Sequence, residues 1–124
     1  MSGTPAQHGD RLLANGPFVI VRTAIDDEGK ADRLAAEIVE QRLAACVQLV
    51  PIRSTYRWKG KLEQAGEFQL LAKTRAALAG RLTDFIRERH PYELPEIVVT
   101  PITGGLAAYL DWVAAETRES PESP

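Results

Sequence analysis

The residues best suited to chemistry gather in the segment 89–96, whose sequence is RHPYELPE. It places an imidazole (His90), a phenol (Tyr92) and two carboxylates around two prolines. Because proline keeps the residue before it out of the α region, Pro91 should end a helix and the segment should be a stiff, extended linker. A stiff linker loses little entropy when its side chains hold a ligand or a neighbouring subunit. This segment is therefore the first candidate for a binding site.

Cys46 is the second candidate. Because it is the only cysteine, the chain cannot form an internal disulfide or a Cys-x-x-Cys zinc site. The thiol could ligate a soft metal, with His90 and Glu96 as nitrogen and oxygen donors. A lone cysteine between small apolar residues is more often a buried hydrophobe, and that interpretation is favoured. For His90 the alternative is a charged cap on the helix C-terminus. Glu93 and Glu96 could be merely solvated, or Glu96 could pair with Lys73.

No pattern typical of an enzyme occurs in the sequence. It lacks a Ser-His-Asp arrangement with a strained elbow, a pair of histidines at helical spacing and a glycine-rich phosphate loop. A thiol dyad of Cys46 and His90 would lack an orienting group and an oxyanion donor. The sequence therefore predicts a protein that is not an enzyme.

Composition favours one layered domain in the cytoplasm. The 124 residues are 44% hydrophobic, enough for a single core. Fifteen basic and seventeen acidic residues are mixed along the chain and give a net charge of −2. This balance predicts neither nucleic acid nor an anionic membrane as a partner. No apolar run approaches the roughly 20 residues that span a bilayer, and the first fifteen residues lack the apolar block of a signal peptide.

Hydrophobic periodicity predicts the order β-α-β-β-α-β followed by one more helix. Strands are expected over 18–21, 46–58, 67–74 and 97–102. Helices are expected from a cap at Asp26 or Asp27 to about Leu43, from a cap at Thr74 to His90, and around Leu106–Val113. This order is the split βαβ or ferredoxin-like plan of the α+β class. Residues 1–16 are expected to be a flexible leader, 17–118 the domain and 119–124 a polar tail.

The two middle strands should form a long hairpin arm that turns at Lys59-Gly60. It carries Tyr56, Trp58 and Phe68 far from any helix of the chain. A two-stranded arm of this length is not stable alone, so another subunit is expected to cover it. Tyr109 and Trp112 of the last helix are expected to be packing residues.

A cleft could form beside this arm. Lys73, at the end of the third strand, is expected to share a rim with four other residues, which are Glu67, Tyr56, Trp58 and Tyr92. One cation, one carboxylate and aromatic walls could capture a ligand. The alternative, which we favour, is that these residues join subunits.

Five motifs of the chain resemble the CutA divalent-cation-tolerance family in its order and spacing, from about Phe18 to Thr117. They are LAACV at 43–47, STYRWKGK at 54–61, Glu67 with Lys73-Thr74, HPYELPE at 90–96 and YLDW at 109–112. The resemblance implies a ferredoxin-like subunit in a tight homotrimer, similar in shape to PII signalling proteins, and an association with copper and other divalent cations. Some family members have a second cysteine where this chain has Arg22, so a site built on that pair is missing.

Three functions are therefore weighed. The first is a non-enzymatic, trimeric divalent-cation-tolerance protein, active in the response to metal ions. It would bind copper or another divalent cation weakly, with Cys46, His90 and Glu96 as candidate ligands. The second is a PII-like regulatory module that binds a small anion or metabolite in a cleft between subunits. The third is a stable trimeric scaffold for protein partners.

Overall fold

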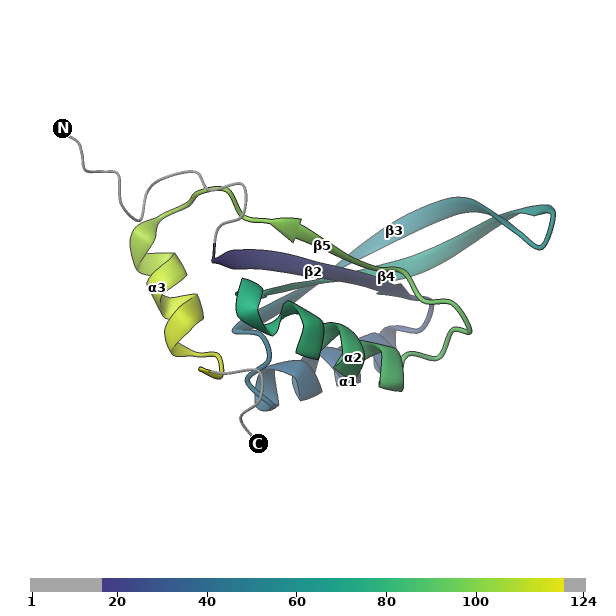
Figure 1. Cartoon of the computed structure of the whole chain (residues 1–124). Coiled ribbons are helices and arrows are strands. Elements are labelled where there is room, and N and C mark those ends of the chain that lie inside the picture. Colours follow the sequence, from purple (N-terminus) through teal and green to yellow (C-terminus); the bar gives the residue numbers. More distant parts are fainter. Residues whose placement is uncertain (1–16, 120–124) are drawn as a thin grey trace.

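The structure, a computed structural model, describes residues 17–119. Its elements are β2 (Phe18–Ile25), α1 (Glu28–Glu40), β3 (Cys46–Trp58), β4 (Lys61–Arg75), the short 3-10 helix η1 (Ala76–Leu78), α2 (Ala79–Arg89), β5 (Ile97–Pro101) and α3 (Ala107–Ala115). The strands form one antiparallel sheet in the order β3-β4-β2-β5 (Figure 1). This order confirms the predicted ferredoxin-like fold. The predicted leader, and the predicted tail apart from residue 119, lie outside the described residues.

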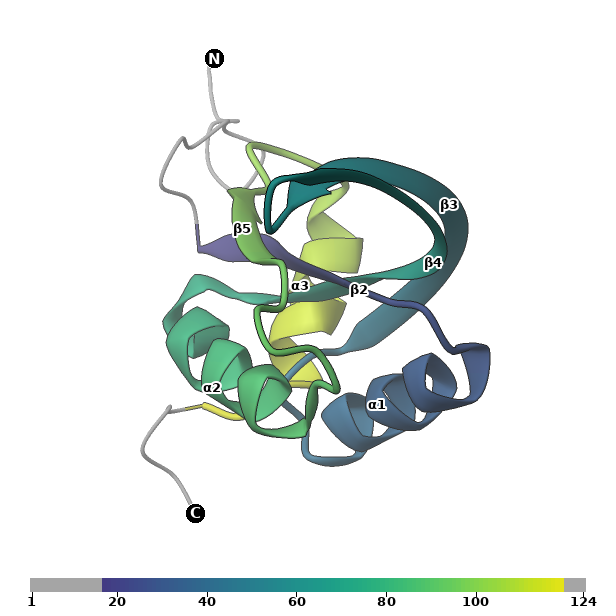
Figure 2. The same ribbon diagram turned by 90° about the vertical axis from the view of Figure 1, so that its right-hand side faces the viewer.

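Helices α1 and α2 lie side by side on the same face of the sheet (Figure 2). Strand residues that point toward them, such as Val21, Leu70 and Ala72, are buried together with Leu34 and Ile38 of α1. Alternate residues of the same strands point the other way. The single core therefore lies between the sheet and this one helical layer.

Local signals set both ends of α1. The Asp27 carboxylate accepts a hydrogen bond from the Lys30 backbone N–H at 2.9 Å, which confirms it as the N-cap. The helix ends at Glu40, earlier than predicted, because Arg42 takes a left-handed φ of 58°. The Leu43 N–H then bonds the Ile38 carbonyl at 3.1 Å, which is the closing bond of a Schellman motif.

The predicted boundaries of two strands are wrong. Strand β2 continues past the predicted end at Val21 to Ile25, and β4 begins at Lys61, before the predicted start at Glu67, and ends at Arg75. Thr74 consequently lies inside β4 and does not cap α2. Its buried hydroxyl donates to the Leu43 carbonyl at 2.7 Å and so ties the end of the sheet to the end of α1.

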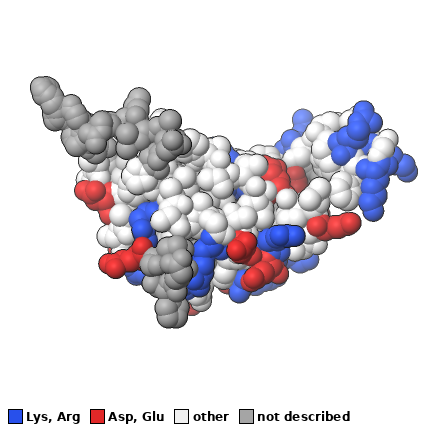
Figure 3. All heavy atoms as spheres, in the orientation of Figure 1, with Lys and Arg blue, Asp and Glu red and all other residues white. Residues whose placement is uncertain are grey.

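An arm, defined as residues 52–67, extends beyond the rest of the sheet (Figure 1). The last residue of β2, Ile25, pairs with Phe68, so β3 and β4 pair only with each other beyond that point. Lys59 and Gly60 turn the arm with φ values of 52° and 82°, as a two-residue hairpin turn requires. Lys and Arg side chains gather at its tip (Figure 3). Phe68 was predicted to lie on the exposed arm, but it packs against the core.

Helix α3 stands across the opposite end of the sheet from the arm (Figure 1). Only Leu110 and Val113 of this helix are buried. The prediction that Tyr109 and Trp112 are packing residues is wrong for the isolated subunit, because these side chains are 37% and 43% exposed. No helix within residues 17–119 has the length and apolar character that crossing a bilayer requires.

The turn of the arm gives a stability prediction. Gly60→Ala should lower the free energy of unfolding by about 1 kcal/mol, because alanine disfavours a positive φ. Gly66→Ala is the matched control, since Gly66 lies on the same arm and an added Cβ meets no atom within 4 Å. Urea denaturation at equal protein concentration measures both. Equal losses in the two variants would contradict the turn geometry.

Candidate functional site

A cluster of three polar residues, here named the polar node, lies where the arm leaves the sheet. It consists of Glu67, His90 and Tyr92. Glu67 is only 8% exposed, although it carries a carboxylate, and the Tyr92 hydroxyl donates to its Oε2 at 2.7 Å. Glu67 is next to Phe68, the residue of β4 that pairs with the last residue of β2, and has no partner in β2 itself. The linker after α2 therefore supplies the group that stabilises this carboxylate.

The ring of His90 is neutral in this setting. Its Nε2 lies 2.9 Å from the Ala24 carbonyl, which can only accept, so Nε2 carries the proton and donates. Its Nδ1 accepts the Tyr92 backbone N–H at 3.2 Å. Burial lowers the pKa of His90, outweighing the Ala24 carbonyl and the charges of Glu67 and Asp26, which raise it. His90 is the C-cap residue of α2, as the alternative expected, but its buried ring is not charged there. A metal could reach a ring nitrogen only if one of these hydrogen bonds were broken.

Tyr92 remains a hydrogen-bond donor over the physiological pH range. Burial raises the pKa of Tyr92, and the hydrogen bond to Glu67 and the charge of Glu67 raise it further. Its ring meets the His90 ring edge to face, with centroids 4.7 Å apart. The arrangement suits an anchor that holds the base of the arm more than an acid or base that exchanges protons.

Cys46 lies toward the other end of the sheet from the polar node. It is half-buried at the start of β3 and pairs in register with Lys73 of β4. The Lys73 ammonium lies 5.5 Å from the centre of the Tyr109 ring. Directly paired residues in antiparallel strands have neighbouring Cβ atoms, so the Cys46 thiol lies beside the stem of Lys73, whose ammonium is turned toward Tyr109.

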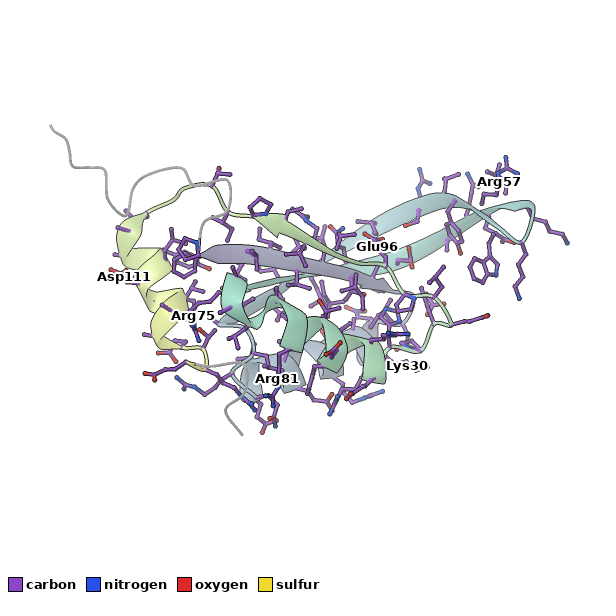
Figure 4. All side chains as sticks on the ribbon, in the orientation of Figure 1. Lys30, Arg57, Arg75, Arg81, Glu96 and Asp111 are labelled. Atoms are coloured by element: carbon purple, nitrogen blue, oxygen red, sulfur yellow. The ribbon has the colours of Figure 1, made fainter. Side chains whose placement is uncertain are left out.

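One subunit does not bring the three predicted metal ligands together. Lys73, beside Cys46, is six residues along β4 from Glu67, which corresponds to about 20 Å of strand. Glu96 is an exposed residue just before β5 (Figure 4) and makes no ion pair with Lys73. Within residues 17–119 no three His, Cys, Asp or Glu side chains are grouped so that they could hold a metal ion. The donors of a single subunit therefore do not fit a preformed metal centre.

The five predicted cleft residues are also only partly gathered. Glu67 and Tyr92 are hydrogen-bonded, and Tyr56 is close enough to influence Tyr92 electrostatically. Trp58 lies at the tip of the arm, where the Lys59 ammonium is 5.6 Å from the centre of its ring. Lys73 lies far along the sheet. Within one subunit, the rim that was to combine a cation with a carboxylate does not form.

The sequence reasoning missed the uncovered side of the sheet, here named the open face. It is the side opposite α1 and α2 and includes Val50, Leu71 and Val98. Val50 and Val98 are both 43% exposed. The signal was present as apolar residues at alternate positions. It was obscured because the continuous run at 97–99 was interpreted only as a strand.

The chain matches the model of the family described as "CutA1 divalent ion tolerance protein" over residues 19–116. The rice "Protein CutA 1, chloroplastic" is 40% identical over 105 residues, which cover 84% of this chain and 59% of the rice protein, less than two thirds of its length. The "Divalent-cation tolerance protein CutA" of Pectobacterium atrosepticum is 46% identical over 110 residues, covering 88% of this chain and 98% of that protein. The crystal structure of CutA1 from Oryza sativa aligns with a TM-score of 0.81 at 40% identity, covering 84% and 96% of the two chains.

The buried ring of His90 predicts a pH dependence of stability. Its folded-state pKa is below the ordinary value of 6.5, so the unfolded chain binds the proton more tightly. Above pH 6.5 the ring is neutral in both states, so its effect on the free energy of unfolding should not change with pH. As pH falls from 6.5 toward the folded pKa, proton uptake by the unfolded chain should lower the free energy of unfolding. Unfolding free energies measured from pH 7 to 5 should therefore fall more in the wild type than in His90→Asn.

The same ring can be observed directly by NMR. The chain has two histidines, so His8→Ala leaves His90 as the only imidazole signal. That signal should titrate below pH 6.5. Titration at or above that value would contradict the buried, neutral ring.

Proposed function

The chain belongs to the CutA1 divalent ion tolerance family, and on that premise we propose that it works as a homotrimer that binds copper or another divalent cation weakly. The family is described by ion tolerance and not by a reaction, in agreement with the prediction of a protein that is not an enzyme. The observation that carries the proposed assembly is the open face together with the arm.

The open face supports association because its apolar side chains have no cover within the described chain. Val50 and Val98 are exposed on two different strands of this face, and Leu71 lies partly exposed on a strand between them. Burying a valine side chain stabilises a complex by about 1.5 kcal/mol or more. Three copies that turn these faces toward a common axis would remove them from water together.

The arm favours a ring over a simple pair. It projects from one end of the subunit and carries unpaired strand edges beyond β2 (Figure 1). An arm that packs on the next copy makes a head-to-tail contact, and such contacts close into a ring when the rotation permits. Tyr56 and Trp58, on the side of the arm continuous with the open face, would then enter the interface.

Weak cation binding is proposed from the separation of the donors. Cys46, His90 and Glu96 remain the candidate ligands. A site with all three would have to combine residues of different subunits, since no group of three donors forms within residues 17–119 of one subunit. Both ring nitrogens of His90 are hydrogen-bonded, so a metal could bind this residue only at the cost of one of these bonds. These features support weak binding of a divalent cation in place of a tight metal centre.

The alternatives receive less support from the geometry. The one carboxylate of the expected cleft, Glu67, is hydrogen-bonded to Tyr92. The cation expected there, Lys73, lies elsewhere on the sheet, so the PII-like module would have no lysine in that cleft with which to bind an anion. On the surface of the described residues, no feature identifies a protein partner for a scaffold. The cytoplasmic location stays a prediction, because the word "chloroplastic" in the name of the rice relative describes that protein.

The proposed trimer can be tested by one pair of matched variants. Light scattering after size exclusion should give three times the chain mass of 13.6 kDa, about 41 kDa, for the wild type. Val50→Glu should dissociate the assembly, because it places a charge on the open face. Val39→Glu, on α1 and 40% exposed, should not. A monomeric wild type at micromolar concentration, or an intact trimer in Val50→Glu, would contradict the proposal.

The proposed cation binding can be tested by calorimetry with Cu²⁺ and with redox-silent Zn²⁺. Cys46→Ser and Glu96→Gln should each weaken binding by about three- to tenfold, since each removes one donor. Glu93→Gln is the control, because it changes an exposed carboxylate of the same linker. If neither metal binds saturably, or if all three variants bind like the wild type, the ligand assignment fails.

A further inference from the structure

The outer side of the helical layer contains a basic hollow that neither the assembly nor the metal proposal uses. Its volume is about 360 Å³, and it lies between the first half of α1 and the end of α2. Lys30, Arg33 and Leu34 come from α1, Arg89 ends α2, and Ile25 and Pro91 complete the wall. Figure 4 shows Lys30 at the end of the helical layer that is nearer the arm. Three chain segments thus meet at this hollow.

The charge of the hollow is positive in a chain whose net charge is −2. Its lining carries three cations, Lys30, Arg33 and Arg89, against one carboxylate, Glu37. Within residues 17–119 the side chains of Lys30 and Arg33 make no ion pair and no hydrogen bond. Two cationic groups are therefore available to a ligand without breaking a contact inside the described chain.

Arg89 is held in place before any ligand arrives. Its guanidinium stacks on the Phe85 ring at 3.6 Å, and its Nη1 donates to the Phe85 carbonyl at 3.3 Å. Nη1 also contacts a Glu88 oxygen at 3.3 Å, and Nε lies 3.8 Å from Glu37. These contacts fix the planar group and leave Nη2 free of any bond within residues 17–119. A fixed guanidinium loses little entropy when it binds an oxyanion.

The floor of the hollow is apolar. Ile25 and Leu34 are core residues whose surfaces close the bottom, and the Pro91 ring stands at the side. A few polar groups above an apolar floor are typical of sites for small organic ligands. Ile25 and Leu34 are only 1% and 4% exposed, so an apolar part of a ligand would touch them at the bottom and meet the exposed Pro91 ring at the side. The ligand that matches both parts carries an oxyanion on an apolar group.

We propose that this hollow binds a small organic oxyanion, a carboxylate or a phosphate attached to an apolar group. Lys30, Arg33 and Arg89 bind its charge, and Ile25, Leu34 and Pro91 contact its apolar part. The site lies on the opposite side of the sheet from the open face, so it stays accessible whether or not the subunits associate. It therefore stands independently of the proposed trimer and of its cation binding.

A second hollow of the same chain can be compared with the proposed site. This hollow of about 340 Å³ lies on another part of α2 and is lined by Asp84, Arg87 and Glu88. It has nearly the same size but a net negative lining. Size alone therefore does not distinguish the two hollows, and charge does. Arg87→Gln gives a matched control that removes a cation from the same helix outside the proposed site.

The experiment is an NMR titration of the full-length chain with four probes. They are phenyl phosphate, benzoate, inorganic phosphate and benzyl alcohol. Phenyl phosphate or benzoate should shift the amide signals of Lys30, Arg33 and Arg89 saturably at millimolar concentration, as expected for an open, solvated site. Inorganic phosphate and benzyl alcohol, which each carry half of the recognised chemistry, should bind more weakly. The tighter of the two aromatic anions identifies the oxyanion class.

Variants decide whether the shifts report this site. Arg33→Gln and Lys30→Gln should each weaken binding by about three- to tenfold, the range for losing one charged contact at a partly exposed site. Arg87→Gln should bind like the wild type. The proposal is overturned if no aromatic anion binds saturably below about 10 mM, if Arg87→Gln weakens binding as much as Arg33→Gln, or if benzyl alcohol binds as tightly as benzoate.

Discussion

Uneven cover of the sheet is the constraint on which the rest of the structure depends. Helices α1 and α2 both pack on one face, where Val21, Leu70 and Ala72 are buried with them. Residues 17–119 supply no third layer for the opposite face, and α3 reaches only one end of the sheet. Apolar residues such as Val50 and Val98 therefore remain in water in a single subunit. This imbalance is the physical reason to expect sister copies.

The arm and the polar node are two consequences of one event, the end of β2 at Ile25. Beyond that residue β4 has no partner on one side, and Glu67 occupies its first position without a partner in β2. A buried carboxylate without a hydrogen bond would cost several kcal/mol. The linker closed by Pro91 places the Tyr92 hydroxyl there, and the neutral ring of His90 fixes the linker to the Ala24 carbonyl. His90 and Tyr92, which first suggested a binding site, therefore hold the base of the arm in each subunit.

Sequence could predict the features that depend on neighbouring residues. The cap at Asp27, the turn at Lys59-Gly60 and the order of the elements follow from local chemistry and periodicity. It could not predict features set by contacts between distant segments. Thr74 bonds the Leu43 carbonyl instead of capping a helix, and His90 is neutral because Ala24 and burial surround it.

The candidate site was predictable only in part for the same reason. The composition of the linker identified Tyr92 as chemically important, and the expected cleft included Glu67, but the register of β4 decides that Lys73 lies about 20 Å of strand away from Glu67. The basic hollow was invisible in the sequence, because Lys30 and Arg33 meet Arg89 only through the packing of α1 against α2. Resemblance to a family identified the fold, whereas the chemistry of each side chain required the tertiary structure.

Amide hydrogen exchange along the arm tests the central claim most directly. A two-stranded hairpin in free solution is marginally stable, so its amides would exchange with little protection. If sister copies complete the sheet, the backbone amides of residues 52–58 and 61–67 that bond across the hairpin should be protected to within about tenfold of those in β2. Rapid exchange throughout the arm while β2 stays protected would show that nothing covers it and would contradict the account.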